Sequence, residues 1–184
     1  NLKQLFRAVA LVAPDKKLIA QVMLFSQGIV TAEDLAGKIV LLFTLCGEQL
    51  SKQTHYDFGL RALKTVLVGA GELKRNFLSK QSTASLLDGK DIYKFESKVL
   101  LQAVWENVVP KLVAEDTTHF ENLLMSVFVG GNLPTDTDDQ FSRVLQDVCR
   151  EEGFECSTTW LSKLHQLKQV LEMRHGVMLV GESC

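Results

Sequence analysis

The stretch TAEDLAGKIVLLFTLCGEQL, residues 31–50, carries the clearest pattern in this 184-residue chain. Its apolar residues recur at intervals of three or four, the spacing that places side chains on one face of an α-helix. Thr31 is a suitable N-cap residue, and Asp34 three positions later is a weaker form of the capping box. The stretch therefore predicts a helix of about five turns. Its buried face would be formed by Leu35, Ile39, Leu42, Cys46 and Leu50.

The same spacing recurs along the chain from residue 16 onward and predicts a mainly α-helical protein. A helix is expected to begin at Asp57 and to be weakened by Gly69 and Gly71. Pro110 is expected to break another helix. Further helices are predicted over 94–109, 115–128, 138–152 and 157–174, with Ser157 as a possible cap of the last.

Breaks in the pattern predict the connections and two strands. The polar segment 79–90 is expected to be a surface loop, and the Gly- and Pro-containing segment 129–137 is a linker candidate. Residues 8–12 and 177–180 are short apolar runs bounded by turn residues, as buried parallel strands would be.

Composition excludes several classes of protein. The net charge of −2, with 23% charged residues and no long block of one sign, argues against a nucleic-acid groove. No apolar run approaches the roughly 20 residues that a membrane span needs. Four scattered cysteines without a CxxC pair predict reduced thiols and no zinc site. The chain lacks an initiator Met and its ends fall inside predicted elements, so we expect a segment cut from a longer protein.

Two stretches contain candidate phosphate-binding residues. RHGVMLVGES, residues 174–183, resembles the entry to a phosphate loop, but the second Gly and the Lys of that motif do not follow Gly181. In HYDFGLRALK, residues 55–64, Arg61 falls in or near the first turn of a helix, where an anion would also meet free backbone N–H groups. Position alone slightly favours the other reading, a solvated arginine beside Lys64.

The remaining candidates for chemistry are isolated. Arg7, just before the first predicted strand, is by position more typical of a surface arginine than of a catalytic one. The four histidines form no triad and no metal set.

Four blocks of the sequence, in order, resemble the motor region of dynein heavy chains. They are NLKQLFRAVALVAPD (1–15), LCGEQLSKQTHYDFGLRALKTVLVGAGELKR (45–75), VLLQAVWENVVPKLVAEDTTHFENLLMSVF (99–128) and MRHGVMLVG (173–181). The phrases HYDFGLRALK and VPKLVAED resemble the cytoplasmic rather than the axonemal branch.

The resemblance implies a joint between two AAA+ modules of a six-module ring. Residues 1–15 would be the last strand region of the first large subdomain, and 16–130 its small helical (lid) subdomain. Residues 131–184 would be a linker and the first helices and strand of the second, α/β large subdomain, cut within its Walker A loop. The catalytic Walker and sensor I elements of the first module would lie before Asn1.

The resemblance also assigns roles to individual residues. Arg61 falls on the sensor II position, where the family's arginine reaches the phosphates of ATP. Arg7 falls on an arginine-finger-like position, although the family usually has Pro where this chain has Ala8. Pro14 and Asp15 match a turn that approaches the adenine. Gly181 matches the first Walker A glycine of the second module.

These assignments imply part of an ATP-driven, minus-end-directed microtubule motor that uses ATP or ADP with Mg²⁺. The expected partners are neighbouring modules of the same chain and, through other regions, microtubules and other dynein subunits, without nucleic acid or membrane. The expected location is cytoplasmic and microtubule-associated, and the isolated segment is expected to be inactive as an ATPase. Composition and apolar stripes alone equally support a rival, a non-enzymatic helical scaffold or adaptor that binds other proteins.

Overall fold

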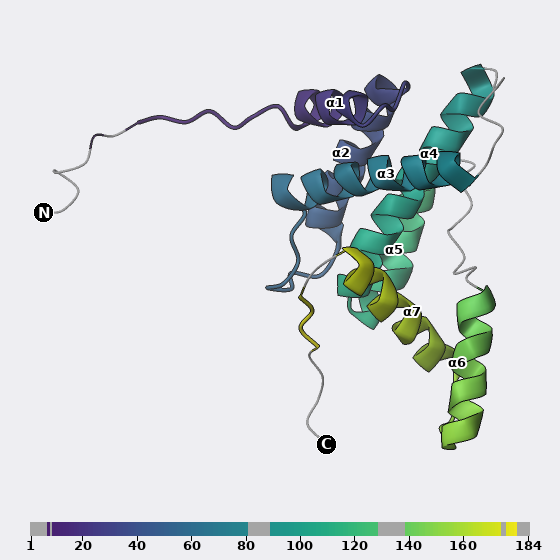
Figure 1. Cartoon of the computed structure of the whole chain (residues 1–184). Helices are drawn as coiled ribbons and strands as arrows, with labels where there is room; N and C mark the ends of the chain where they lie inside the picture. The colour runs from purple at the N-terminus through teal and green to yellow at the C-terminus, as the bar shows by residue number, and fades with distance from the viewer. Residues whose placement is uncertain (1–6, 8, 81–88, 129–138, 174–175, 180–184) are drawn as a thin grey trace, which may run out of the picture.

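The structure is a computed structural model that describes residues 7, 9–80, 89–128, 139–173 and 176–179. All regular secondary structure in these residues is helical (Figure 1), which confirms the predicted mainly α class. The elements are α1 (Lys16–Ser26), α2 (Ala32–Gln49), α3 (Leu60–Lys80), α4 (Gly89–Val108), the short 3-10 helix η2 (Val109–Lys111), α5 (Ala114–Val127), α6 (Asp139–Glu152) and α7 (Thr158–Met173).

Helices α1 to α5 share one apolar core. Helix α1 packs against α2 and α3, α3 packs against α4, and α2 packs against α5. Every residue of the stripe predicted in 31–50 is buried in this core. Burial of a large apolar side chain stabilises the folded state by about 1.5–3 kcal/mol. Each of the five helices contributes at least one such side chain, among them Leu24, Leu35, Leu67, Leu100 and Phe120.

The helix starts differ in part from the predictions. Asp15 caps α1, because its Oδ1 accepts from the backbone N–H of Lys17 at 2.9 Å and of Leu18 at 3.2 Å. Thr31 precedes α2 as predicted, but its side chain makes no capping bond and donates to Glu96 instead. Helix α3 begins only at Leu60, so the prediction that it begins at Asp57 is wrong by three residues.

The two glycines of α3 do not weaken the helix, which continues to Lys80. They lie where other elements approach closely. A Cβ atom at Gly69 would be 3.3 Å from Asn107 Nδ2, and one at Gly71 would be 2.7 Å from the Cβ of Gln27. The conformational cost of glycine is therefore offset by close packing of α1 and α4 on α3.

Helices α5, α6 and α7 begin and end within one residue of their predicted bounds, whereas α4 begins at Gly89, five residues before the predicted start at 94. Pro110 lies in η2 and ends α4, because proline lacks the N–H that would continue the helical ladder. Ser157 precedes α7, and its Oγ accepts from the N–H of Trp160 at 3.3 Å. Most of the predicted loop 79–90 and the whole linker candidate 129–137 lie outside the described residues.

The two predicted strands are not formed in the described residues. Residues 9–12 and 177–179 have no regular structure, and Leu11 and Met178 are largely exposed. A strand is stable only when a neighbouring strand accepts and donates its backbone hydrogen bonds. No such neighbour lies beside either run in the part of the chain that the structure describes, and the segment before α1 extends away from the helices (Figure 1).

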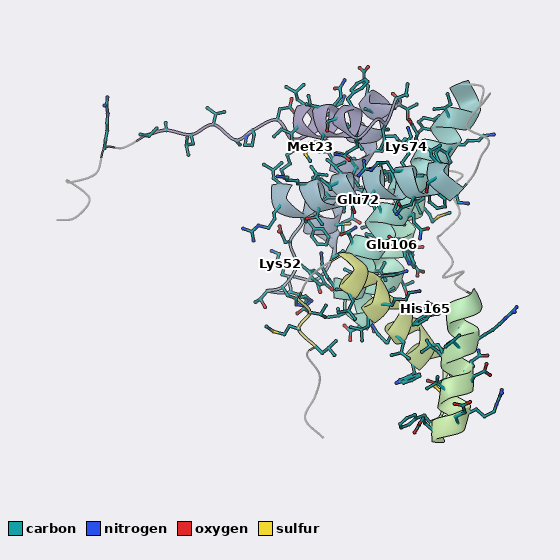
Figure 2. The ribbon with its side chains drawn as sticks, in the orientation of Figure 1. Met23, Lys52, Glu72, Lys74, Glu106 and His165 are labelled. Atoms are coloured by element: carbon teal, nitrogen blue, oxygen red, sulfur yellow. The ribbon has the colours of Figure 1, made fainter. Side chains whose placement is uncertain are left out.

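Helices α6 and α7 lie outside the main core. Helix α7 contacts α4 and η2. It also meets α6 through a 2.8 Å hydrogen bond between Ser142 Oγ and the buried His165 Nε2 (Figure 2). The main cluster of buried apolar residues nevertheless draws all its members from residues 20–128. Among the helices described, none has both the length and the apolar composition required to cross a membrane.

Candidate functional site

Arg61 lies in the first turn of α3, as its sequence position predicts. Gly59 caps this turn, since its carbonyl accepts from Leu63 N at 3.1 Å. The Arg61 side chain is exposed, and no hydrogen bond or ion pair joins it to any described residue. Lys64 is exposed one turn later on the same helix. The guanidinium is therefore free to bind an anion at the positive end of the α3 dipole.

The loop that leads to Arg61 is held by a buried carboxylate. Asp116, in the first turn of α5, is only 6% exposed. Its Oδ1 accepts from Ser51 N at 3.3 Å, and its Oδ2 accepts from the hydroxyls of Ser51 and, at 2.7 Å, Tyr56. The Tyr56 hydroxyl in turn accepts from Val113 N at 2.9 Å.

These bonds favour the ionised form of Asp116. The Ser51 hydroxyl is the largest cause that lowers the pKa of this carboxyl. Burial opposes it, and the Tyr56 hydroxyl and the Ser51 amide lower the pKa further. Burial and the adjacent Asp116 carboxylate raise the pKa of Tyr56. At neutral pH the pair is therefore a carboxylate that accepts from a neutral phenol.

A second buried carboxylate connects α3, α4 and the turn between α1 and α2. Glu96 on α4 is fully buried and accepts from Val30 N at 2.9 Å and Thr31 N at 2.8 Å. Lys74 of α3 donates to Glu96 Oε1 at 2.6 Å and to the carbonyl of Gly28 at 2.6 Å (Figure 2). This cluster fixes the turn between α1 and α2 onto α3 and α4, so its role is structural.

Sequence reasoning missed both carboxylates. Glu96 precedes Val99 and Leu100 by three and four residues, so it falls on the buried stripe of α4, and an acidic residue there is a signal of a buried pair. Asp116 gives no comparable signal, because a carboxylate in the first turn of a helix is ordinary.

The other predicted site residues are not gathered around Arg61. Arg7 is exposed in the extended segment before α1. Pro14 is exposed beside it, and Asp15 uses its carboxylate to cap α1. No hydrogen bond or ion pair between described residues joins this segment to α3. Gly181 lies outside the described residues.

Among the residues that the structure describes, the cavity next to the start of α3 is too small for a nucleotide. The cavity beside the first turns of α3 has a volume of about 20 Å³ and is lined by residues that include Tyr56, Phe58, Ala62 and Lys111. That volume holds about one water molecule. In the part of the chain that the structure describes, no group of three His, Cys, Asp or Glu residues is placed to hold a metal ion. Arg61 is exposed to solvent beside this cavity and is not among the residues that line it.

Comparison with known protein families shows which family the chain belongs to. Residues 1–184 match the family described as "Hydrolytic ATP binding site of dynein motor region". The chain belongs to this dynein motor family. Its predicted resemblance to dynein heavy chains is therefore confirmed over the full length.

Similar dynein heavy chains are found in distant organisms. The chain is 49% identical to a cytoplasmic dynein heavy chain of Paramecium tetraurelia over 98% of its length. It is 47% identical to that of Dictyostelium discoideum and 50% identical to that of Caenorhabditis elegans, each over 100% of its length. The chain covers 4% of each of these dynein heavy chains.

Proposed function

We propose that this segment forms the lid side of the main ATP site of a cytoplasmic-type dynein heavy chain, with Arg61 as the residue that contacts the nucleotide phosphates. The observation that carries the proposal is the exposed guanidinium at the N-terminus of α3, which no described residue binds by a hydrogen bond or ion pair, in a chain of this family. A fixed cation at a helix N-terminus stabilises the charge that develops on phosphoryl oxygens.

Most of the ATP site would be built elsewhere in the heavy chain. Bound ATP with Mg²⁺ supplies the phosphoryl group that water attacks. Arg61 would orient and partly neutralise that group from the lid, which would link nucleotide state to the position of the lid. Arg7 as an arginine-finger-like residue, Pro14 and Asp15 beside the adenine, and Gly181 in the next Walker A loop remain predictions.

The proposed division into subdomains is supported by the packing. The main core draws on residues 20–128, which fits a small helical subdomain over 16–130. Residues 1–15 and 131–184 would then belong to the large subdomains on either side. A lid with its own core can move as a rigid body when nucleotide binds or leaves.

The proposed partners follow from the family. The segment would contact neighbouring AAA+ modules of the same heavy chain, and other regions would bind microtubules and further dynein subunits in the cytoplasm. The rival function, a helical adaptor without enzymatic context, is not favoured by a family match that covers residues 1–184.

The test is Arg61→Ala in the complete heavy-chain motor that contains this segment. We expect a loss of ATP turnover of tenfold or more, because removal of one preorganised donor to developing charge typically costs about 100-fold or more. Microtubule-stimulated turnover is expected to fall with it, while the circular dichroism spectrum stays unchanged.

Lys64→Ala is the matched control, because Lys64 is also an exposed cation of α3 but lies one turn further from the helix N-terminus. Its turnover should equal that of the wild type. Equal turnover in all three proteins would show that Arg61 is a solvated side chain and would remove it from the site. The segment alone is expected to hydrolyse no ATP.

A further inference from the structure

The loop between α2 and α3, residues 50–59, sets the position of Arg61 but has little structure of its own. Its internal backbone hydrogen bonds are Gln53 N to Ser51 O at 3.0 Å and Tyr56 N to Gln53 O at 3.2 Å. Most of its side chains are exposed, Lys52 among them (Figure 2). A loop with so few internal bonds takes its conformation from what it is attached to.

The attachments converge on the corner between η2 and α5. Asp116 accepts from Ser51 at the start of the loop and from Tyr56 near its end. His55 Nε2 donates to the carbonyl of Lys111 at 2.9 Å. The loop is therefore fixed to this corner at three of its residues.

Aromatic packing continues this attachment toward α3. The rings of Tyr56 and Phe58 meet edge to face with centroids 5.8 Å apart, and Phe58 meets Phe43 of α2 at 6.1 Å. Asp57 Oδ1 then accepts from Gly59 N at 2.8 Å, which closes a tight turn one residue before α3. Arg61 follows two residues after Gly59, so a shift of Tyr56 is transmitted to Arg61 through a short, constrained segment.

The Asp116 carboxylate does not cap its own helix, α5. A carboxylate in the first turn of a helix commonly accepts from the free N–H groups of that helix. The Asp116 carboxylate instead accepts from Ser51 and Tyr56, which lie 65 and 60 residues away in the sequence. The carboxylate is buried against the loop that precedes Arg61, and this placement requires an explanation other than helix capping.

We propose that Asp116 is a positioning residue for the nucleotide site. Its carboxylate, together with the Tyr56 hydroxyl, holds the α2–α3 loop in the conformation that places the Arg61 guanidinium within contact distance of the nucleotide phosphates. This inference rests on the proposed function of Arg61. It adds two residues, Asp116 and Tyr56, that touch no nucleotide themselves.

The primary test is Asp116→Asn in the complete heavy-chain motor. The amide has one acceptor oxygen and two N–H donors in place of two acceptor oxygens, so it cannot accept all the bonds from Ser51 and Tyr56. We expect kcat/KM for ATP to fall roughly tenfold, since a misplacement of about 1 Å can cost about 100-fold. Tyr56→Phe, which removes a single hydroxyl, is expected to produce a smaller fall.

A double substitution separates positioning from general destabilisation. If Asp116 acts through Arg61, Asp116→Asn will lower kcat/KM in the wild type but not further in an Arg61→Ala background. Glu115→Gln is the matched control, because Glu115 is an exposed carboxylate in the same turn of α5. It should leave kcat/KM unchanged in both backgrounds.

Hydrogen exchange of the peptide spanning residues 50–64 provides a second readout in the same proteins. Asp116→Asn should accelerate exchange there, and Glu115→Gln should not. The inference would be overturned if Asp116→Asn lowered kcat/KM equally in the wild-type and Arg61→Ala backgrounds. It would also be overturned if Asp116→Asn changed neither hydrogen exchange nor kcat/KM while Arg61→Ala lowered turnover. Both outcomes would leave the proposed function intact. A silent Arg61→Ala would overturn the proposed function itself, and the positioning role with it, whatever the exchange shows.

Discussion

At the scale of single residues, buried carboxylates connect segments that are far apart in the sequence. Glu96 accepts from Val30 and Thr31, and Lys74 neutralises it. Burial raises the pKa of Glu96, but hydrogen bonds from Lys74, Thr31 and Val30 outweigh burial, so the net pKa is lowered. Removal of one partner from a buried ion pair leaves the other uncompensated, which is far more costly than loss of a surface pair.

Glu96→Gln is therefore expected to lower the free energy of unfolding by about 3 kcal/mol, measured by urea denaturation of the 184-residue chain at pH 7. Glu72→Gln is the control, because Glu72 is an exposed carboxylate in the middle of α3 (Figure 2). It should change stability by less than about 0.5 kcal/mol. Equal effects of the two substitutions would contradict the structural role of Glu96.

The same residue predicts a pH dependence. The pKa of Glu96 in the folded chain is below the usual value of 4.5. As the pH falls, Glu96 is therefore protonated in the unfolded chain at a higher pH than in the folded chain. Its contribution to stability is thus complete above pH 4.5 and is lost as the pH drops toward the folded pKa. Glu96→Gln should flatten this part of the stability profile, and an unchanged slope would show that other groups cause the acid sensitivity.

At the scale of elements, glycines decide how closely the helices pack. Gly71 of α3 is buried against Gln27, the residue that follows α1, and has no room for a Cβ atom. Gly47 of α2 is exposed and would meet no atom within 4 Å. The two positions have the same helical backbone but opposite surroundings.

Alanine at these two positions is expected to have opposite effects. Gly47→Ala should raise the free energy of unfolding by up to about 1 kcal/mol, because alanine favours the helix. Gly71→Ala should lower it by about 1–3 kcal/mol, because α1 must move. Thermal unfolding would show the difference, with Tm changing by about 2–4 °C per kcal/mol for a chain of this size. A gain of stability at both positions would show that α1 and α3 separate without cost.

At the scale of the whole molecule, stability is concentrated in α1 to α5. The main apolar cluster lies within residues 20–128, whereas among the described residues after 138 only Cys149 and His165 are buried. The last two helices are held by the contacts of α7 with α4 and η2 and by the bond between α6 and α7.

A chain shortened to residues 9–128 is thus expected to unfold in one cooperative transition when it is heated. Far-UV circular dichroism would measure this transition. The complementary chain 139–179 should show no cooperative transition, because so few of its described side chains are buried. Loss of cooperativity in the 9–128 chain would mean that α6 and α7 are required for folding of the main core.

Local periodicity in the sequence predicted the mainly helical fold correctly. The stripe from Leu35 to Leu50 is buried as expected, and Arg61 lies in a first turn as expected. Both follow from residues within a few positions of each other, because the α-helix is stabilised by bonds between near neighbours. The family resemblance was also readable from the sequence, since its blocks are distributed between residues 1 and 181 and the family match covers residues 1–184.

Only the tertiary structure showed which distant segments meet. Asp116 reaches Ser51, and Glu96 reaches Thr31, each across 65 residues, and no local pattern encodes those pairings. The packing of Gly71 against Gln27 depends on such a contact too. The apolar runs at 9–12 and 177–179 have strand-like sequences, yet they are not strands here. Sequence periodicity thus determined that the chain is mainly helical, whereas hydrogen bonds between distant residues decided how the loop before Arg61 is attached, because such bonds exist only once the helices have packed.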